Sequence, residues 1–193
     1  MSIVLVGSTS GSITLQEPAV AGTTVLDLPA TSGTILTTAS QSIPSAALPI
    51  GSVLQVVNAT YSTAATTTSG TFQDTGLSAT ITPSFSSSKI LVIWAINGVY
   101  AATGIGVETN LVRTSTQIVY TENLAARATL PSGNADAGSG TSGGTYLDSP
   151  ATTSATTYKC QFRSRDGSAS VTVQFSGGGG TSTSMITLME IAA

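Results

Sequence analysis

Short runs of β-branched and aromatic residues, separated by Gly, Ser, Pro and Asn or Asp, fill this 193-residue chain from end to end. No stretch combines a capping residue with the 3.6-residue apolar period of an amphipathic helix, so helices are not expected. Short strands at this spacing predict an all-β sandwich or barrel. The expected strands cover residues 3–6, 12–16, 23–28, 34–38, 53–59, 70–74, 77–82, 89–100, 107–113, 117–122, 156–163, 170–175 and 185–191.

Turn-forming residues separate these runs. Glycine adopts positive φ at little cost, which favours turns at 74–76, 83–88, 165–167 and 177–180. The longest expected loop runs from Leu124 to Tyr146. Pro44 and Pro49 argue against a helix over residues 39–51 and indicate a linker. We therefore expect an N-terminal attachment and oligomerisation segment at 1–50 and a head domain at 51–193.

Two expected strands, 90–96 and nearly so 185–191, are apolar on both faces. A strand buried on both sides is ordinary where helices cover a sheet, but no helices are expected here. Either the N-terminal segment or neighbouring subunits must cover the second face, and we favour subunits. An N-terminal part of roughly 40 residues is also small enough to need disulfides, metals or oligomerisation. The candidate core and trimer-interface residues are Ile90, Val92, Trp94, Ile96, Ile186 and Leu188.

Composition removes several classes of function. Only 8% of the residues are charged, against about 25% in typical domains. With no histidine, the chain lacks imidazole-based catalysis and imidazole metal ligands, and it has no basic cluster for nucleic acid. No run approaches the roughly 20 apolar residues of a membrane span, and the apolar start is too short for a signal peptide. We expect no catalytic residues, no cofactor, no metal, no nucleic acid and no membrane insertion.

A few polar and aromatic residues remain as candidates for binding. Asn134 and Asp136 stand two apart, like the first ligands of a calcium loop, but the downstream Glu is missing. We interpret them as part of a surface loop that contacts a receptor, with Tyr146 beside it as a saccharide contact. Cys160 alternates with Tyr158 and Phe162, which predicts a buried, unreactive thiol.

Residues 7–24, Gly-Ser-Thr-Ser-Gly-Ser-Ile-Thr-Leu-Gln-Glu-Pro-Ala-Val-Ala-Gly-Thr-Thr, resemble a segment that recurs in tail fibre and related virion proteins of tailed bacteriophages. The phrases at 72–83, 88–92, 146–150 and 186–191 are similar to a globular module at the ends of phage fibres, especially in marine phages. This resemblance implies a homotrimer that docks on other virion proteins through its N-terminal segment. It also implies an antiparallel β-sandwich head of jelly-roll type that binds a host-surface glycan or protein.

Only a short segment precedes the head, which favours a short spike or tail-tip fibre over a long fibre. The expected function is a structural virion protein, a tail fibre or tail-tip protein that attaches the phage to its host. A capsid decoration or head fibre protein is the alternative, placed on the capsid surface instead of the tail. A polysaccharide depolymerase spike is the second alternative, although the nine acidic residues are scattered singly.

Overall fold

The computed structural model describes residues 2–6, 12–16, 45, 48–101, 106–124, 139–177 and 180–193. The chain divides into two units, Met1–Ser42 and Ile43–Ala193, and the second is called the head below. In the first unit, β1 (Ser2–Val6) and β2 (Ser12–Gln16) lie where strands are expected, and the two strands pair antiparallel. The strands expected at 23–28 and 34–38 lie outside the described residues.

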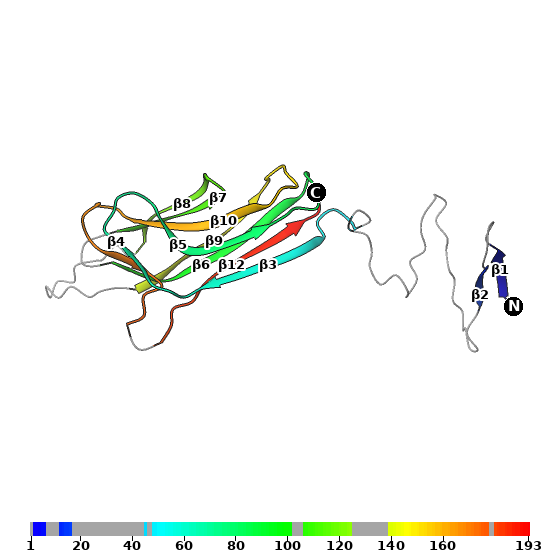
Figure 1. Ribbon diagram of the computed structural model, residues 1–193, viewed down its shortest axis with the longest axis horizontal. Helices are drawn as coiled ribbons and strands as arrows, with labels where there is room; N and C mark the ends of the chain where they lie inside the picture. Colours follow the sequence, from blue (N-terminus) through cyan, green and yellow to red (C-terminus); the bar gives the residue numbers. More distant parts are fainter. Residues whose placement is uncertain are drawn as a thin grey trace. The chain divides into compact units, whose positions relative to one another are not determined.

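The head is built from two antiparallel sheets (Figure 1). We call the sheet with strand order β5-β10-β7-β8 the β7 sheet. The other, with order β3-β12-β6-β11-β4 and with β9 also paired to β6, is the β6 sheet. The strands are β3 (Val53–Tyr61), β4 (Ala65–Thr67), β5 (Gln73–Ile81), β6 (Lys89–Ala101), β7 (Val107–Arg113), β8 (Thr116–Leu124), β9 (Ser139–Asp148), β10 (Thr156–Ser164), β11 (Val171–Val173) and β12 (Ser184–Ile191).

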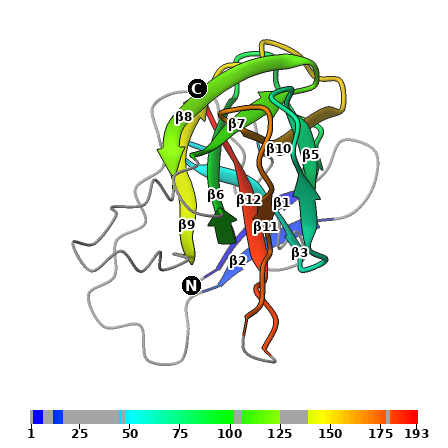
Figure 2. The ribbon, with the colours of Figure 1, turned by 90° about the vertical axis from the view of Figure 1, so that its left-hand side faces the viewer.

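The pairing is that of one long hairpin rolled up on itself. From the β7–β8 turn outward, β7 pairs with β8, β6 with β9, β5 with β10 and β3 with β12. Pairing of β12 with β6 and of β10 with β7 then joins these hairpin rungs into two sheets (Figure 2). The short strand β11 pairs with the C-terminal end of β6, beyond the part that pairs with β12, and β4 pairs with β11. This double Greek-key arrangement is a jelly-roll β-sandwich, so the expected all-β fold class is confirmed.

The core lies between the sheets and follows the period-2 alternation of each strand. On β10, Tyr158, Cys160 and Phe162 are buried, and Leu111 on β7 faces the same interior. The alternation arises because successive side chains of a strand point to opposite faces. No helix within the described ranges is long and apolar enough to cross a bilayer.

One expected turn is wrong. The sequence pattern places a turn at 74–76 between two strands, whereas these residues lie inside the single strand β5. The register against β10 shifts between Lys159 and Gln161, so the extra residues form a bulge. Gly76 has φ +86°, and a Cβ there would overlap the ring of Tyr61. Gly76 therefore permits a bulge inside a strand, which is a common role of glycine in β-sheets.

Part of the long expected loop is also wrong. Residues 139–146, expected to belong to the loop 124–146, form most of β9, which pairs with β6. Their Gly- and Ser-rich composition gives no strand signal. Packing supplies the reason, because a Cβ on Gly144 would lie 3.1 Å from the Trp94 ring, and one on Gly143 would overlap the Trp94 carbonyl. Small residues here let β9 approach the largest side chain of β6.

Candidate functional site: an apolar sheet face and a polar sheet face

All six candidate core and interface residues lie inside the sandwich. Ile90, Val92, Trp94 and Ile96 on β6, with Ile186 and Leu188 on β12, are buried against the β7 sheet. Their burial is complete within one chain, so they form the core and leave no surface for a partner. Any interface on these strands must use the side chains that alternate with them.

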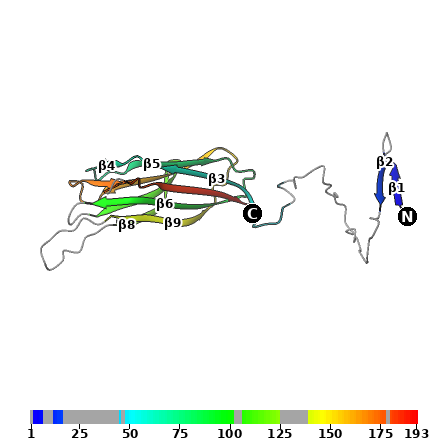
Figure 3. The same cartoon turned by 90° about the horizontal axis from the view of Figure 1, so that it is seen from below.

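The alternating residues form an apolar surface on the outside of the β6 sheet. We call this surface the apolar face and define it by Val56, Leu91, Ile93, Leu147, Met185 and Met189. In the strand register, Val56 lies opposite Met189, Met189 opposite Leu91, and Leu91 opposite Leu147. A row of four apolar side chains therefore crosses β3, β12, β6 and β9, strands that Figure 3 shows from another side. Val56 is 55% exposed, Leu147 51%, Met185 47% and Ile93 39%.

Charge is distributed unequally between the two outer surfaces. The next row of the apolar face holds Ile93 between neutral polar residues, with Asn58 and Thr187 on one side and Thr145 on the other. The charged side chain at its margin is Lys89, which donates to Ser149 Oγ at 3.2 Å. Two ion pairs, Lys159–Asp74 and Arg163–Glu108, lie on the outside of the opposite β7 sheet instead. One surface of the head is thus apolar and nearly uncharged, while the other is polar.

Tyr120 is at the centre of a cluster on the polar surface of the β7 sheet. Glu108 on β7 is buried and accepts a hydrogen bond from Arg163 Nε on β10 at 2.6 Å. The guanidinium of Arg163 stacks over Phe72, 4.7 Å from the ring centroid, and donates to the Gly70 carbonyl. Phe72 and Tyr120 meet edge to face, with ring centroids 6.2 Å apart. We call Phe72, Glu108, Asn110, Tyr120 and Arg163 the Tyr120 cluster.

The electrostatics of the cluster follow from these contacts. Desolvation and a hydrogen bond to Glu108 raise the pKa of Tyr120. The hydrogen bond to Glu108 likewise raises the pKa of Arg163. Both side chains therefore keep their protons at physiological pH. Sequence reasoning identified none of these residues as a site, because they come from distant positions and only the sheet brings them together.

The expected receptor-contact residues are not assembled by the described structure. Asn134 and Asp136 lie outside the described residues. Tyr146 lies on β9 opposite Val92, on the inner face, and its ring packs against the core. Tyr146 is thus placed inside the sandwich, where pairing with β6 fixes its direction, and is not part of a loop.

Two buried carboxylates besides Glu108 are held by internal donors. Glu190 accepts hydrogen bonds from Gln55 Nε2 at 2.6 Å, Ser84 N at 2.6 Å, Ser84 Oγ at 3.0 Å and Ser88 Oγ at 2.7 Å. Burial raises the pKa of Glu190, but these hydrogen bonds outweigh it and hold the pKa below its ordinary value. The carboxylate anchors the 83–88 turn to the end of β12.

Asp148, at the end of β9, is the other of these two carboxylates. It binds Arg113 Nη1 with both oxygens, at 2.8 and 2.9 Å, and accepts the Tyr158 hydroxyl at 2.7 Å. Desolvation and the hydrogen bond to Asp148 raise the pKa of Tyr158. The side chains come from both sheets, so this cluster ties them together. No group of His, Cys, Asp and Glu that could hold a metal ion occurs among the residues the structure describes.

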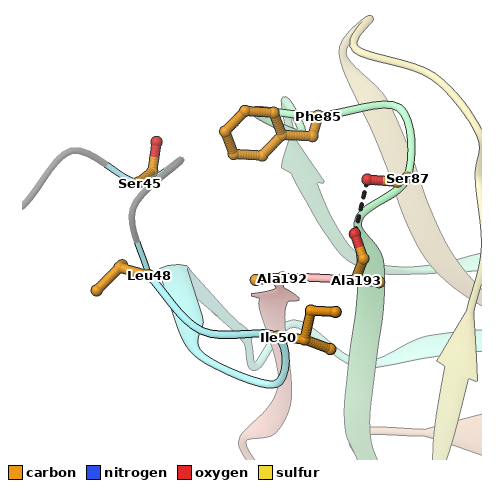
Figure 4. A pocket seen from close by; sticks show the side chains of 7 residues that line it. All are labelled: Ser45, Leu48, Ile50, Phe85, Ser87, Ala192 and Ala193. Carbon is orange, nitrogen blue, oxygen red and sulfur yellow. Dashed lines mark hydrogen bonds between the residues drawn. The ribbon is translucent and has the colours of Figure 1, made fainter. Parts of the chain in front are cut away.

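A shallow pocket lies where the chain enters the head (Figure 4). Its volume is about 240 Å³, and Ser87 Oγ donates to the Ala193 carbonyl at 2.8 Å beside it. The lining residues are Ser45, Leu48, Ile50, Phe85, Ser87, Ala192 and Ala193. The pocket holds no charged side chain that would orient a small polar ligand.

Comparison with known proteins finds distant similarity to solved structures. No protein-family profile matches the sequence, and no curated protein matches it. Among solved structures, this chain is similar to the VP2 protein of infectious bursal disease virus in its subviral particle, with 13% identity and a TM-score of 0.36. The match covers 72% of this chain and 38% of the VP2 chain. A similarity of this extent carries no inference about function.

Proposed function

We propose that this protein is a non-enzymatic virion protein of a tailed bacteriophage, a homotrimeric tail fibre or tail-tip protein that attaches the particle to its host. The observation that carries the proposal is the apolar face, which one copy leaves exposed to solvent. Contiguous exposed apolar patches on soluble proteins mark interaction sites. The sequence resemblance to phage fibre proteins suggests that the protein is viral and that the oligomer has three subunits.

A second copy of the chain suits the apolar face. Two such faces can approach without burying unpaired charges, which would be costly. Burying the remaining half of a Val, Leu, Ile or Met side chain contributes about 1 kcal/mol each, so several per copy give a substantial association energy. In a ring of three, the apolar face of each copy would contact an adjoining surface of its neighbour, and the same contact would repeat around the ring.

The arrangement of the chain ends supports attachment at one end of the head. Gly51 N donates to the Ala192 carbonyl at 2.8 Å, and Ala192 N donates to the Ser52 carbonyl at 2.9 Å. Gly51, where the chain enters the head, and Ala192 are therefore adjacent, so the chain leads into the head at this end. We assign this end to the virion and the opposite end, with the turn at 165–167, to the host side.

The buried carboxylates support a non-enzymatic role. Glu190 and Asp148 are each saturated by donors from the same chain, and Glu108 is paired with Arg163. Glycoside hydrolysis instead needs a facing pair of carboxyl groups, one of them holding a proton for the leaving group. Release of reducing sugar from host envelope by the purified protein would contradict this part of the proposal.

Electron microscopy of gold-labelled particles tests the location. Antibodies raised against the head should place gold at the tail or tail tip. Gold spread over the capsid would overturn the tail assignment in favour of a capsid decoration or head fibre protein. Antibodies adsorbed beforehand with purified head provide the matched control, which should remove all label.

A further inference from the structure

We propose that the outer surface of the β7 sheet is a binding site for a neutral saccharide, with Tyr120 as the stacking residue. The inference rests on the proposed function, since copies packed on the apolar face would leave the β7 sheet facing outward. It moves the receptor contact away from Asn134, Asp136 and Tyr146. Tyr120 is 37% exposed and lies on the surface that assembly would not cover.

The first step is the character of this surface. The large apolar side chains exposed in the described part of the chain are Ile50, Val53, Val56, Ile93, Tyr120, Leu147 and Met185, and only Tyr120 lies on the β7 sheet. A protein partner needs an apolar interface core, which a single ring does not supply. A sugar needs one flat apolar surface for its C–H face and hydrogen-bonding groups around it, and Tyr combines a ring with a polar tip.

Polar groups surround the ring in the register of the sheet. Asn110 lies opposite Tyr120 on one side and opposite Gln161 on the other, and Gln161 lies opposite Asp74. The amides provide both donors and acceptors in fixed planes. Asn110 Nδ2 donates to Gln117 Oε1 at 3.0 Å, and Gln161 Nε2 donates to Asp74 Oδ1 at 2.6 Å. Gln117 and Gln161 are therefore held in place on either side of Asn110, on the same outer surface as the Tyr120 ring.

An unpaired acceptor lies beside the ring. Asn110 is nine-tenths buried or more, and its Oδ1 has no hydrogen-bond partner within the described residues. Leaving a buried polar group unpaired costs about 1 to 3 kcal/mol. Asn110 lies opposite Tyr120 in the strand register, and its Oδ1 is covered in the unliganded protein, so a ligand hydroxyl recovers that cost where a neighbouring side chain moves aside on binding.

Charge on this surface favours a neutral ligand. Lys159 pairs with Asp74 at 2.9 Å and Arg163 with Glu108 at 2.6 Å, so each of these cations is already neutralised. Glu122 follows Tyr120 by two residues on the same face of β8 and raises its pKa through its charge. A phosphate- or sulfate-bearing ligand would meet a carboxylate and no unpaired cation on this described surface.

Fluorine NMR of the full chain labelled with fluorotyrosine tests the site. The chain has five tyrosines, so five resonances are expected, and Tyr120→Phe identifies that of Tyr120. Tyr61 and Tyr146 pack on the core, Tyr158 is buried and Tyr100 stacks on Phe175, so the other four act as internal controls. The probes are glucose, galactose, mannose, rhamnose and N-acetylglucosamine at tens of millimolar, with heparin as the anionic control.

We expect a saturable shift of the Tyr120 resonance with at least one neutral sugar and none with heparin. Gln161→Ala should weaken that sugar about tenfold, the equivalent of 1.4 kcal/mol, whereas Thr80→Ala, on the same sheet but away from the cluster, should not. Absence of a Tyr120 shift with every sugar, a shift at Tyr100 instead, or a shift with heparin alone would overturn the proposal. So would a shift that only detergent-solubilised envelope proteins produce.

The two proposals fail separately. A saccharide shift at Tyr120 together with gold on the capsid would leave the site standing and remove the tail assignment. A tail-located trimer whose Tyr120 resonance ignores every sugar would keep the proposed function and remove this site.

Discussion

Replacing Glu190 with glutamine should destabilise the head strongly although it changes one oxygen to an NH₂ group. The carboxylate accepts hydrogen bonds from Ser84 N and Gln55 Nε2. Neither group can become an acceptor without loss. A backbone N–H can only donate, and flipping the Gln55 amide would break its hydrogen bond to the Thr82 carbonyl, which is 2.7 Å long. In either orientation the amide NH₂ of the variant faces one of these two donors. The serine hydroxyls can rotate to accept, but they lose a charged partner.

The magnitude follows from these contacts. A hydrogen bond to a charged group contributes about 1.5 to 3 kcal/mol, so losing one and weakening the others should cost about 2 to 4 kcal/mol. For a domain of 150 to 250 residues, that corresponds to a fall in Tm of about 10 °C. Calorimetry at one fixed protein concentration measures it, since assembly makes Tm depend on concentration.

The effect should also depend on pH. The pKa of Glu190 is lowered in the folded state below its ordinary value of 4.5. Its stabilisation is therefore fully present above that ordinary value and is lost as the pH falls through the folded pKa. The difference between the native chain and Glu190→Gln should be largest at neutral pH and should shrink in acid. Glu122→Gln, an exposed control, should change the free energy of unfolding by less than about 0.5 kcal/mol. Equal Tm values for native and Glu190→Gln at neutral pH would refute the reasoning.

Three other predictions follow from single contacts. Gly76→Ala should cost about 2 kcal/mol or more, because the new Cβ meets the Tyr61 ring at a positive φ, and Tyr61→Leu should recover part of that loss in urea denaturation. Burial raises the pKa of the Cys160 thiol to about 12, so a thiol reagent at mildly alkaline pH should label the protein only after unfolding; rapid labelling of the native form would contradict the burial. Asp148→Asn should lower stability by about 2 to 4 kcal/mol, since it removes the charge that pairs with Arg113 and puts an NH₂ donor where one acceptor oxygen was. Tyr158→Phe should cost only about 1 kcal/mol, and comparable losses for the two variants in calorimetry would contradict this.

Much of the fold could be predicted from local residue patterns. β-Branched residues between turn-forming residues predict strands such as β7 and β12, and the bounds of these strands agree closely with expectation. β9 could not be predicted, because Gly143 and Gly144 have low strand propensity. Glycine is favoured at both positions because a Cβ there would approach Trp94 too closely. The bulge at Gly76 could not be told from a turn, since glycine serves both.

The sites were harder to predict than the strands. A strand that is apolar on both faces has two equivalent sets of side chains, and the period of two does not say which set faces inward. The sheet pairing decides it, placing Trp94 inside and Ile93 outside. The Tyr120 cluster draws on four separate segments, and nothing local to Phe72 or Arg163 signals that they meet.

Sedimentation of the native chain beside Ile93→Asp tests the central claim, that the apolar face joins copies of this protein. The native chain should sediment with three times the chain mass of 19.2 kDa at low micromolar concentration. Ile93→Asp should dissociate it into folded monomers, because Ile93 is already partly exposed in one copy, while Thr80→Asp on the β7 sheet should remain assembled. A native chain that sediments as a folded monomer, or an Ile93→Asp variant that stays fully assembled, would contradict the account.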